Sequence, residues 1–364
     1  MVTKGFLVLE TGEVYEGVWG GPQQPNFERA GEVVFNTSHQ GYEEIATDPS
    51  YFSQIVVMTA PMQGNYGADQ QVWESRKIWI EGFIALQIQK TEREQSWLQT
   101  LIKAEVPAIT EMDTRAIALR LRSGGTPWGA LVFSTDAAQA KSKAERLIAD
   151  KKRIESDWVH LASRQQVETL AGEKARGPRI AVLDFGAKEN ILRELKKRAR
   201  EVRVFPSRTP AAEIAAYQPD GLMLTNGPGD PAQVQIAPET VRHFVGRIPI
   251  YGICMGHQVL ALALGASTFK LKFGHRGANH PIQDRLLGRI YMTSQNHGYA
   301  VKGETLPKDA QVTQVNLNDQ TVAGFYSEKN SYLGIQYHPE SHPGPHEATE
   351  LFDFFVEKMM GVRK

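Results

Sequence analysis

The chain has 364 residues, of which 41% are hydrophobic and 23% are charged, and its formal net charge is zero. These values are typical of a soluble globular protein, and a neutral chain offers no electrostatic footprint for nucleic acid or for an anionic membrane. The single cysteine excludes an intrachain disulfide and a multi-cysteine zinc site, and the length favours two domains over one core.

The beginning of the chain predicts no secretory signal. Residues 1–10 contain one lysine and a short apolar run at 6–9, far less than the apolar core of a signal peptide. The longest apolar helical stretch, Val259–Ala266, is much shorter than the roughly 20 residues that span a bilayer. We therefore expect a cytoplasmic protein with no membrane segment, and a single cysteine fits such a reducing compartment.

Residues 1–165 are expected to form a first, β-rich α/β domain. Glycine and proline interrupt short predicted strands at Gly5–Glu10, Val14–Trp19, Glu32–Asn36 and Gln54–Ala60. Helices are predicted at Gln95–Ala104, Asp113–Arg122 and Asp136–Lys151. Asp113 is suited to the N-cap of the second helix, and Gly124 and Gly125 follow its end.

Residues 166–177 predict a linker, because they are polar and charged and show little apolar periodicity. Residues 178–364 form the second predicted domain, in which short apolar runs alternate with amphipathic helices. These segments are Ile180–Phe185, Lys188–Arg200, Glu201–Phe205, Gly221–Thr225, Pro238–Val245, Ile248–Ile253 and Gln258–Leu264. The alternation is typical of a mostly parallel sheet covered by helices on both faces, so the predicted fold class is α/β.

Cys254 lies between an apolar strand and an apolar helix, in the sequence Y-G-I-C-M-G-H-Q. The G-x-C-x-G spacing is that of a nucleophile elbow, because Gly252 and Gly256 remove Cβ atoms that would clash at a sharp turn. The helix dipole favours a thiolate there, and the backbone amide of Met255 is the leading candidate to bind an oxyanion. The alternative is a buried, unreactive cysteine.

His338 is the best candidate for the base, at the end of the apolar strand 332–337. Residues two apart in an extended chain face the same side, and Pro339 stiffens the link, so Glu340 is suited to orient the imidazole. Cysteine, histidine and carboxylate make up the nucleophile, base and orienting group of acyl-transfer enzymes. Spacing alone leaves other histidines open as the base, namely His257, His275, His280, His297, His342 and His346.

Three motifs together resemble the class I, triad-type glutamine amidotransferases: T-N-G-P-G-D-P at 225–231, G-I-C-M-G-H-Q at 252–258 and H-P-E at 338–340. Further segments resemble the small subunit of carbamoyl phosphate synthetase, so that the resemblance covers nearly the whole chain. These are F-N-T-S-H-Q-G-Y-E-E-I-A-T-D-P-S-Y at 35–51, D-T-R-A-I at 113–117, L-D-F-G-A-K-E-N-I-L-R at 183–193 and G-A-N-H-P-I at 277–282. The resemblance implies a flavodoxin-like glutamine amidotransferase domain after a small-subunit N-terminal domain that contacts the large subunit.

By this resemblance, Cys254, His338 and Glu340 are the catalytic triad. The implied contacts with L-glutamine are Ser50, Gly227, Gly229, Met255, Gln258, Asn296, Gly298 and Tyr299. Met255 and Tyr299 stand where the family pattern leads us to expect leucine and phenylalanine. Without the resemblance, Ser50 is best interpreted as a turn residue after Asp48-Pro49.

The resemblance also implies the reaction and the partner. The cysteine attacks the side-chain amide of glutamine, a glutamyl thioester forms, and water hydrolyses it to glutamate. Ammonia then passes through a tunnel to a large synthetase subunit, which makes carbamoyl phosphate from bicarbonate and ATP for arginine and pyrimidine biosynthesis. Because the chain has no G-x-x-x-x-G-K-[ST] loop, we expect no cofactor or metal in it, and ATP and Mg²⁺ on the large subunit.

Three other functions account for the sequence less completely. The glutaminase of another synthase, such as that for anthranilate or GMP, would resemble only the second half of the chain. A stand-alone γ-glutamyl or cysteine hydrolase would leave the β-rich first half unexplained. A regulatory subunit that binds glutamine without catalysis would be expected to lack a triad residue, and none is missing.

Overall fold

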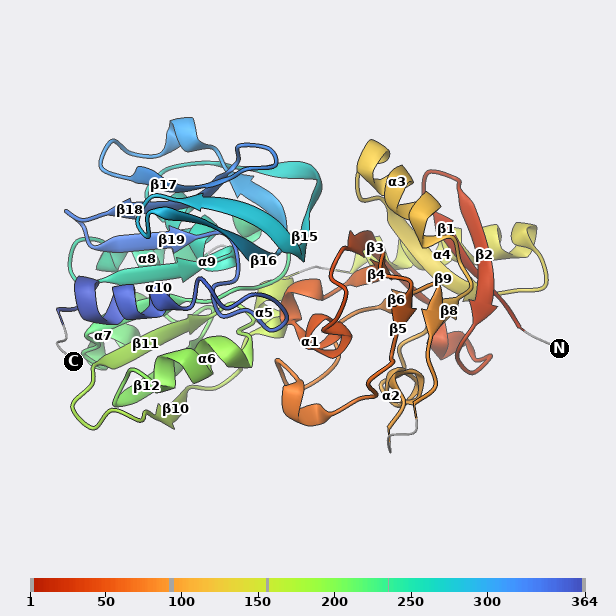
Figure 1. Cartoon of the computed structure of the whole chain (residues 1–364), viewed down its shortest axis with the longest axis horizontal. Coiled ribbons are helices and arrows are strands. Elements are labelled where there is room, and N and C mark those ends of the chain that lie inside the picture. The colour runs from red at the N-terminus through yellow and green to blue at the C-terminus, as the bar shows by residue number, and fades with distance from the viewer. Residues whose placement is uncertain (1–2, 92–94, 155–156, 235, 362–364) are drawn as a thin grey trace. The chain divides into compact units, whose positions relative to one another are not determined.

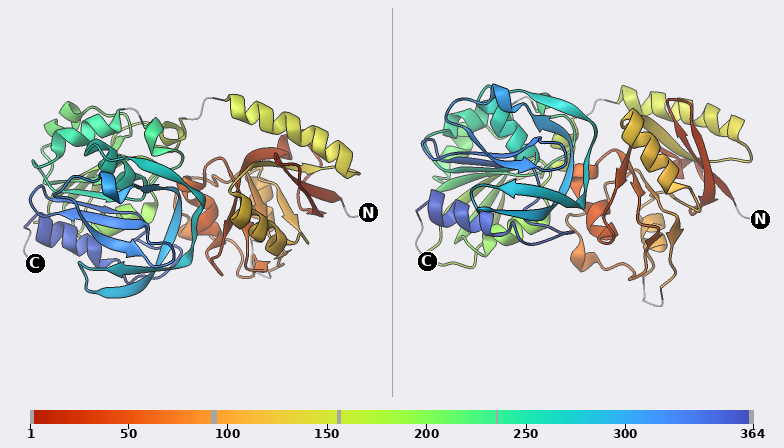
Figure 2. Two further views of the ribbon diagram at one scale, coloured as in Figure 1. Left: turned by 90° about the horizontal axis from the view of Figure 1, so that it is seen from above. Right: turned by 45° about the horizontal axis from the view of Figure 1, so that its top comes forward.

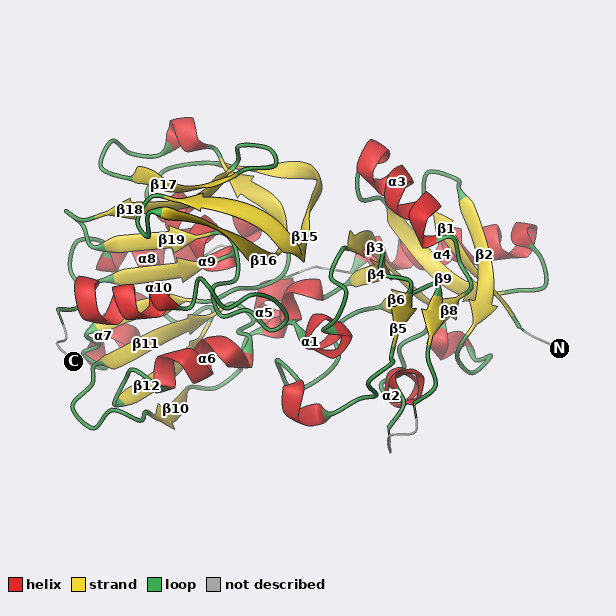
Figure 3. Ribbon diagram, viewed as in Figure 1, coloured by secondary structure: helices red, strands yellow, loops and turns green. Residues whose placement is uncertain are grey.

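The computed structural model of the chain describes residues 3–91, 95–154, 157–234 and 236–361 (Figure 1). The chain divides into two compact units, Met1–Ser156 and Asp157–Lys364, each with its own buried clusters of apolar side chains. Each unit combines helices with strands, which confirms the α/β fold class (Figure 3). Within the described residues, no helix combines the length and the apolar character that crossing a bilayer requires.

The first unit contains a closed barrel whose strands follow the order β1-β2-β8-β6-β4-β3-β9. These strands are β1 (Lys4–Leu9), β2 (Val14–Trp19), β3 (Arg29–Asn36), β4 (Gln54–Met58), β6 (Gly82–Ile84), β8 (Ala108–Thr110) and β9 (Trp128–Phe133). A small separate sheet pairs β5 (Met62–Gln63) with β7 (Gln87–Ile88). The helices are α1 (Tyr42–Thr47), α2 (Trp97–Lys103), α3 (Thr114–Gly124) and α4 (Ala137–Arg153), with short 3-10 turns η1 (Pro25–Phe27), η2 (Pro49–Tyr51) and η3 (Gln70–Val72).

The sequence predicted β1 to β4 and α2 to α4, and the structure confirms them. Asp113 caps α3, because its Oδ1 accepts a hydrogen bond from the Ala116 amide at 2.8 Å, and Gly125 follows the helix with a φ of 91°. Strand β9 was not predicted, and β6 and β8 have only three residues each, which is too short for a periodic pattern. Strand β1 is buried on both faces: Leu7 shares a cluster with the other barrel strands, and Phe6 shares one with α4.

The second unit is built on a sheet whose strands follow the order β10-β12-β11-β13-β14-β19-β18-β17-β15-β16. They are β10 (Glu168–Ala171), β11 (Arg179–Asp184), β12 (Glu201–Pro206), β13 (Gly221–Leu224), β14 (Ile250–Ile253), β15 (Thr268–Asp284), β16 (Arg289–Val301), β17 (Gln311–Asn316), β18 (Val322–Ser327) and β19 (Tyr332–Ile335). The run from β12 to β19 is parallel, as predicted. The antiparallel extension from β18 to β16 was not predicted, because strand-helix alternation signals only the parallel part.

Helices cover this sheet on both faces (Figures 1 and 2). They are α5 (Trp158–Ala162), α6 (Glu189–Lys196), α7 (Ala211–Ala216), α8 (Ala237–Phe244), α9 (Met255–Ala263) and α10 (Glu350–Asp353), which the π-helix η6 (Phe354–Met359) continues. Two 3-10 turns are η4 (Pro231–Gln233) and η5 (Gly303–Thr305). Along β11, Ile180 and Val182 pack in a cluster with α6 and α10, while Ala181 and Leu183 pack with α7, α8 and α9. This alternation is what a strand buried on both faces requires.

The segment 166–177, predicted as a linker, contains β10, which pairs antiparallel with β12 at the edge of the sheet. Its side chains are mostly exposed, so its sequence is polar like that of a linker although its backbone is paired. The compact units divide between Ser156 and Asp157, before the predicted boundary at residue 165. The reason is that α5 packs into the second unit, where Val159 belongs to a buried cluster and the Ser163 hydroxyl accepts a hydrogen bond from the Ser207 amide at 3.0 Å.

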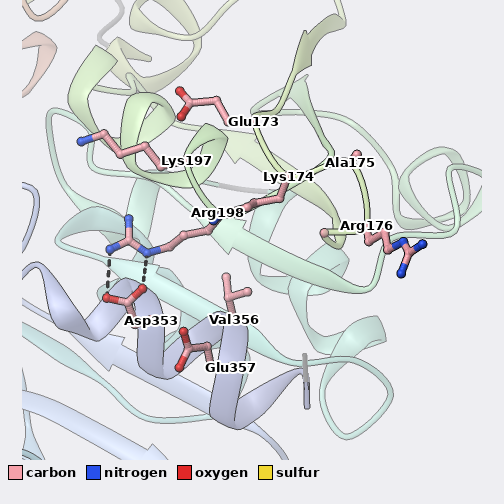
Figure 4. Close-up of a pocket in the computed structure, with 10 residues that line it drawn as sticks. Glu173, Lys174, Ala175, Arg176, Lys197, Arg198, Asp353, Val356 and Glu357 are labelled. Atoms are coloured by element: carbon pink, nitrogen blue, oxygen red, sulfur yellow. Dashed lines mark hydrogen bonds and ion pairs between the residues drawn. The ribbon is translucent and has the colours of Figure 1, made fainter. Parts of the chain in front are cut away.

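A surface pocket of about 590 Å³ lies beside the loop that follows β10 (Figure 4). On one side, Arg198 donates hydrogen bonds to both carboxylate oxygens of Asp353, at 2.7 and 3.0 Å. The residues that line this pocket include none of the predicted site residues.

Candidate active site

Cys254 lies at the turn between β14 and α9, where it is the N-cap residue of the helix. Its backbone has φ 52° and ψ −103°, a conformation that residues with a side chain rarely adopt and that is common at functional sites. The flanking glycines permit the turn: a Cβ on Gly252 would lie 2.6 Å from the Gly256 carbonyl oxygen, and one on Gly256 would lie 2.2 Å from that of Leu224. The predicted strand-to-helix turn with obligatory glycines is therefore present.

The sulfur of Cys254 is almost fully buried, and it donates a hydrogen bond to the Asn296 carbonyl oxygen at 3.6 Å. Met255 is the first residue of α9, so its amide N–H is one of those for which a helix provides no partner of its own. This amide lies beside the nucleophile in the chain and is available to an oxyanion.

His338 and Glu340 form a buried pair, with 2.6 Å between His338 Nδ1 and Glu340 Oε1. Burial disfavours the imidazolium, but the Glu340 carboxylate and the Cys254 sulfur together outweigh burial and raise the pKa of His338 above its usual range. Among the described residues, His338 Nε2 has no hydrogen-bond partner. The arrangement therefore holds one ring nitrogen on the carboxylate and leaves the other for proton transfer.

Sequence reasoning missed Lys188, which lies buried behind this pair. Its Nζ lies 3.1 Å from Glu340 Oε1 and also donates a hydrogen bond to the Ser341 carbonyl oxygen. Burial would raise the pKa of Glu340, but the Lys188 ammonium and the His338 imidazolium hold it below its usual range. The lysine stands in the segment 183–193 that carries part of the family resemblance, but no local pattern connects it with a carboxylate so far along the chain.

The rival histidines have other surroundings. His257 is fully buried against Phe325, and burial lowers its pKa to about 3, so it remains neutral. Both ring nitrogens of His297 have partners within its own strand, β16. His275 pairs with Asp319, and the rings of His342 and His346 lie against each other. The geometry favours His338 as the base, because it pairs with a buried carboxylate and interacts with the Cys254 sulfur, which helps to raise its pKa.

Gly227 and Gly229 lie in the loop after β13, where the backbone geometry favours glycine at both positions. A Cβ on Gly227 would lie 2.4 Å from the Phe185 carbonyl oxygen, and Gly229 has a φ of 86°. The Gly256 amide donates a hydrogen bond to the Thr225 carbonyl oxygen at 2.9 Å, so this loop is attached to the first turn of α9.

Asn296, Gly298 and Tyr299 all lie on β16, and α9 is bonded to that strand through Gln258. The Gln258 Nε2 donates hydrogen bonds to the Tyr299 carbonyl oxygen at 2.8 Å and to Gln336 Oε1 at 3.0 Å. The structure thus brings most of the predicted glutamine contacts onto elements that meet around Cys254.

Ser50 lies in the first unit, at η2, where its amide donates a hydrogen bond to Asp48 Oδ1 at 2.9 Å. It is therefore a turn residue, as its local sequence indicates, and its contact with glutamine remains a prediction. Among the described residues, no group of three or more His, Cys, Asp or Glu side chains is arranged to hold a metal ion.

Comparison with known proteins identifies relatives for both units. Residues 181–358 match the family model of class-I glutamine amidotransferases, and residues 7–131 match that of the carbamoyl-phosphate synthase small chain, CPSase domain. The carbamoyl phosphate synthase small chain of Symbiobacterium thermophilum is 44% identical, with 96% of both chains covered. Those of Listeria monocytogenes serotype 4b and Thermus thermophilus are 43% and 41% identical, covering 99% and 98% of this chain and 98% and 93% of theirs.

Proposed function

The chain belongs to the family of carbamoyl phosphate synthase small chains, and we propose that Cys254, His338 and Glu340 carry out its glutamine hydrolysis. As the glutamine-hydrolysing subunit, it converts glutamine to glutamate and ammonia for carbamoyl phosphate synthesis. The observation that supports the proposed triad is the buried 2.6 Å contact between His338 and Glu340, beside a cysteine at a strand-to-helix turn.

The proposed reaction begins when Cys254 gives its thiol proton to His338, whose raised pKa, due largely to the Glu340 carboxylate, favours the imidazolium that results. The thiolate attacks the side-chain amide carbon of glutamine, and the Met255 amide together with the loop 226–229 stabilises the oxyanion. His338 gives its proton to the departing ammonia, which leaves a glutamyl thioester. His338 then takes a proton from water, which attacks the thioester and releases glutamate.

Glutamine is proposed to bind along β16 and the first turn of α9. The contact residues are Ser50, Gly227, Gly229, Met255, Gln258, Asn296, Gly298 and Tyr299. The attachment of Gln258 to the Tyr299 carbonyl oxygen supports this site, since it fixes the distance between the two elements that would hold the substrate.

The ammonia is proposed to be used by a large synthetase subunit, since the relatives are named as small chains of a synthase. ATP and Mg²⁺ are proposed to bind to that subunit rather than to this chain, and the assembly is proposed to be cytoplasmic. A glutaminase for another synthase is disfavoured, because the family match at residues 7–131 is specific to the carbamoyl phosphate synthase small chain.

The test replaces the nucleophile in the full chain combined with a large synthetase chain. Cys254→Ser is expected to lower glutamate release by about 10³-fold or more, because the hydroxyl is a far weaker nucleophile at this site. Carbamoyl phosphate formation from added ammonium salt should persist, which shows that the assembly is intact. Glutamate release at the wild-type rate would remove Cys254 from the mechanism.

A further inference from the structure

Strand β16 contacts both Cys254 and the segment 336–340, which carries His338 and Glu340. The Asn296 carbonyl oxygen accepts the hydrogen bond from the Cys254 sulfur. Two residues earlier, the Ser294 carbonyl oxygen accepts one from the His338 backbone amide at 2.9 Å. The position of β16 relative to the segment 336–340 therefore affects how the base faces the nucleophile.

A buried chain of hydrogen-bonded hydroxyl groups joins β16 to the segment that carries His338. The Tyr291 hydroxyl on β16 lies 2.6 Å from the hydroxyl of Tyr337, the residue before His338. Tyr291 also donates a hydrogen bond to Asp284 Oδ2 at 2.6 Å. Because that bond uses the only hydroxyl proton of Tyr291, its oxygen accepts the proton of Tyr337.

Asp284 anchors this chain of hydrogen bonds, because its other carboxylate oxygen is held in place by hydrogen bonds of its own. Oδ1 accepts hydrogen bonds from the amides of Leu286 and Leu287, at 2.8 and 3.0 Å, and from Gln314 Nε2 at 3.1 Å. The carboxylate is about 1% exposed, so water does not compete for it. Burial and the Asp284 charge raise the pKa of Tyr291, and burial raises that of Tyr337, so both hydroxyls stay protonated at neutral pH.

We propose that the chain of Asp284, Tyr291 and Tyr337 positions the segment that carries His338 against β16, so that the two tyrosines are positioning residues for glutamine hydrolysis. The inference rests on the proposed function of the triad. Apolar packing alone would hold these segments together, but a chain of short, directional hydrogen bonds fixes how far one slides along the other. A displacement of a fraction of an ångström at His338 is enough to slow proton transfer.

The test removes each hydroxyl while keeping the ring, in the full chain combined with a large synthetase chain. Tyr291→Phe is expected to lower kcat for glutamate release by about tenfold with an unchanged KM for glutamine, because the base and not the substrate contacts is displaced. Weaker pairing of thiolate and imidazolium should also move the acidic limb of the pH profile of kcat/KM to higher pH. Tyr337→Phe should have a smaller effect, because Tyr291 keeps its bond to Asp284.

The double variant gives a signature that simple loss of packing would not produce. In Tyr291→Phe the Tyr337 hydroxyl is left buried without its acceptor, and adding Tyr337→Phe removes that hydroxyl. The double variant should therefore be no slower and no less stable than Tyr291→Phe alone. An additive loss of kcat would contradict a single connected chain.

Tyr332→Phe is the matched control. Tyr332 is a buried tyrosine of β19 in the same sheet, and its hydroxyl donates a hydrogen bond to Asp309 Oδ2 at 2.8 Å. Both Tyr332→Phe and Tyr337→Phe should lower Tm by about 2–4 °C. Tyr332→Phe, however, should leave kcat and the pH profile unchanged.

The outcomes separate this inference from the proposed function. If Cys254→Ser abolishes glutamate release and Tyr291→Phe keeps the kcat and pH profile of Tyr332→Phe, the positioning role is overturned and the triad stands. If Cys254→Ser stays active, the triad itself is overturned. Should Tyr291→Phe fail to fold, Tyr337→Phe decides, since it leaves Asp284 with all its donors.

Discussion

At the scale of single residues, the site depends on buried charges that stabilise one another. His338, Glu340 and Lys188 are each no more than about 2% exposed. A carboxylate taken out of water is costly unless it is paired and hydrogen-bonded, and Glu340 Oε1 contacts both the His338 imidazole and the Lys188 ammonium. The cation behind the carboxylate is thus a condition for keeping an ionised Glu340 next to the base.

Removing that cation should destabilise the protein. Lys188→Met is expected to cost about 3 kcal/mol at neutral pH, because it leaves a buried carboxylate without its cation. Glu340 has a folded-state pKa of about 2, lowered from its ordinary value, so it stabilises the fold above the unfolded pKa and loses that effect as pH falls through the folded pKa. Denaturant unfolding should therefore show the gap between variant and wild type narrowing below about pH 4.

Lys197→Met is the control for this prediction. Lys197 pairs with Glu194, but its side chain is 54% exposed, so the loss should stay below about 0.5 kcal/mol. Equal losses for the two lysine variants would show that Lys188 stabilises the fold through something other than its buried charge.

At the scale of elements, helix ends and strand pairings set the framework that carries the site. Helix α9 begins at the cysteine, β16 reaches both catalytic segments, and the loop after β13 is bonded to α9. Helices in the first unit follow local signals instead, as the cap at Asp113 shows.

The cap of α3 offers a test at this scale. Asp113→Ala should destabilise the first unit by about 1 kcal/mol, because the Ala116 amide loses its acceptor, whereas Asp113→Asn should retain most of the stability. Thermal unfolding of the full chain monitors both variants. A loss as large for asparagine as for alanine would mean that the charge and not the hydrogen bond stabilises this helix end.

At the scale of the whole molecule, the protein consists of two units with separate cores, and the junction lies before α5. Residues 157–164 are attached to the second unit through Val159 and Ser163, and through the Arg164 amide, which donates a hydrogen bond to Asp184 Oδ2 at 2.7 Å. The α5 segment is therefore part of the second unit's structure and not a tether.

Truncation tests this division. A chain of residues 157–364 is expected to fold cooperatively, whereas one of residues 166–364 should melt at least about 5 °C lower, because it loses the buried Val159 and the bonds of Ser163. Circular dichroism during heating measures both. Equal melting temperatures would place the boundary of the folded unit at residue 166 or later.

The sequence by itself determined those features that depend on neighbours along the chain. The turn at Cys254, the cap at Asp113, the first strands of the barrel and the parallel run of the second sheet all follow from patterns within a few residues. The family resemblance also indicated the class of reaction, which is glutamine hydrolysis. Spacing alone left His338 among several histidines, because it does not say which of them meets the cysteine.

Only the tertiary structure decided which distant groups meet. Lys188 reaches Glu340, and Asp284 reaches the segment of His338 through Tyr291, across stretches of chain that carry no local signal of the pairing. The edge strand β10 was missed for a related reason: its pairing with β12 is a long-range contact, while its exposed polar side chains are those of a linker. Local patterns fix where elements begin and which face is buried, but side-chain contacts across a sheet are set by packing, which the linear sequence does not display.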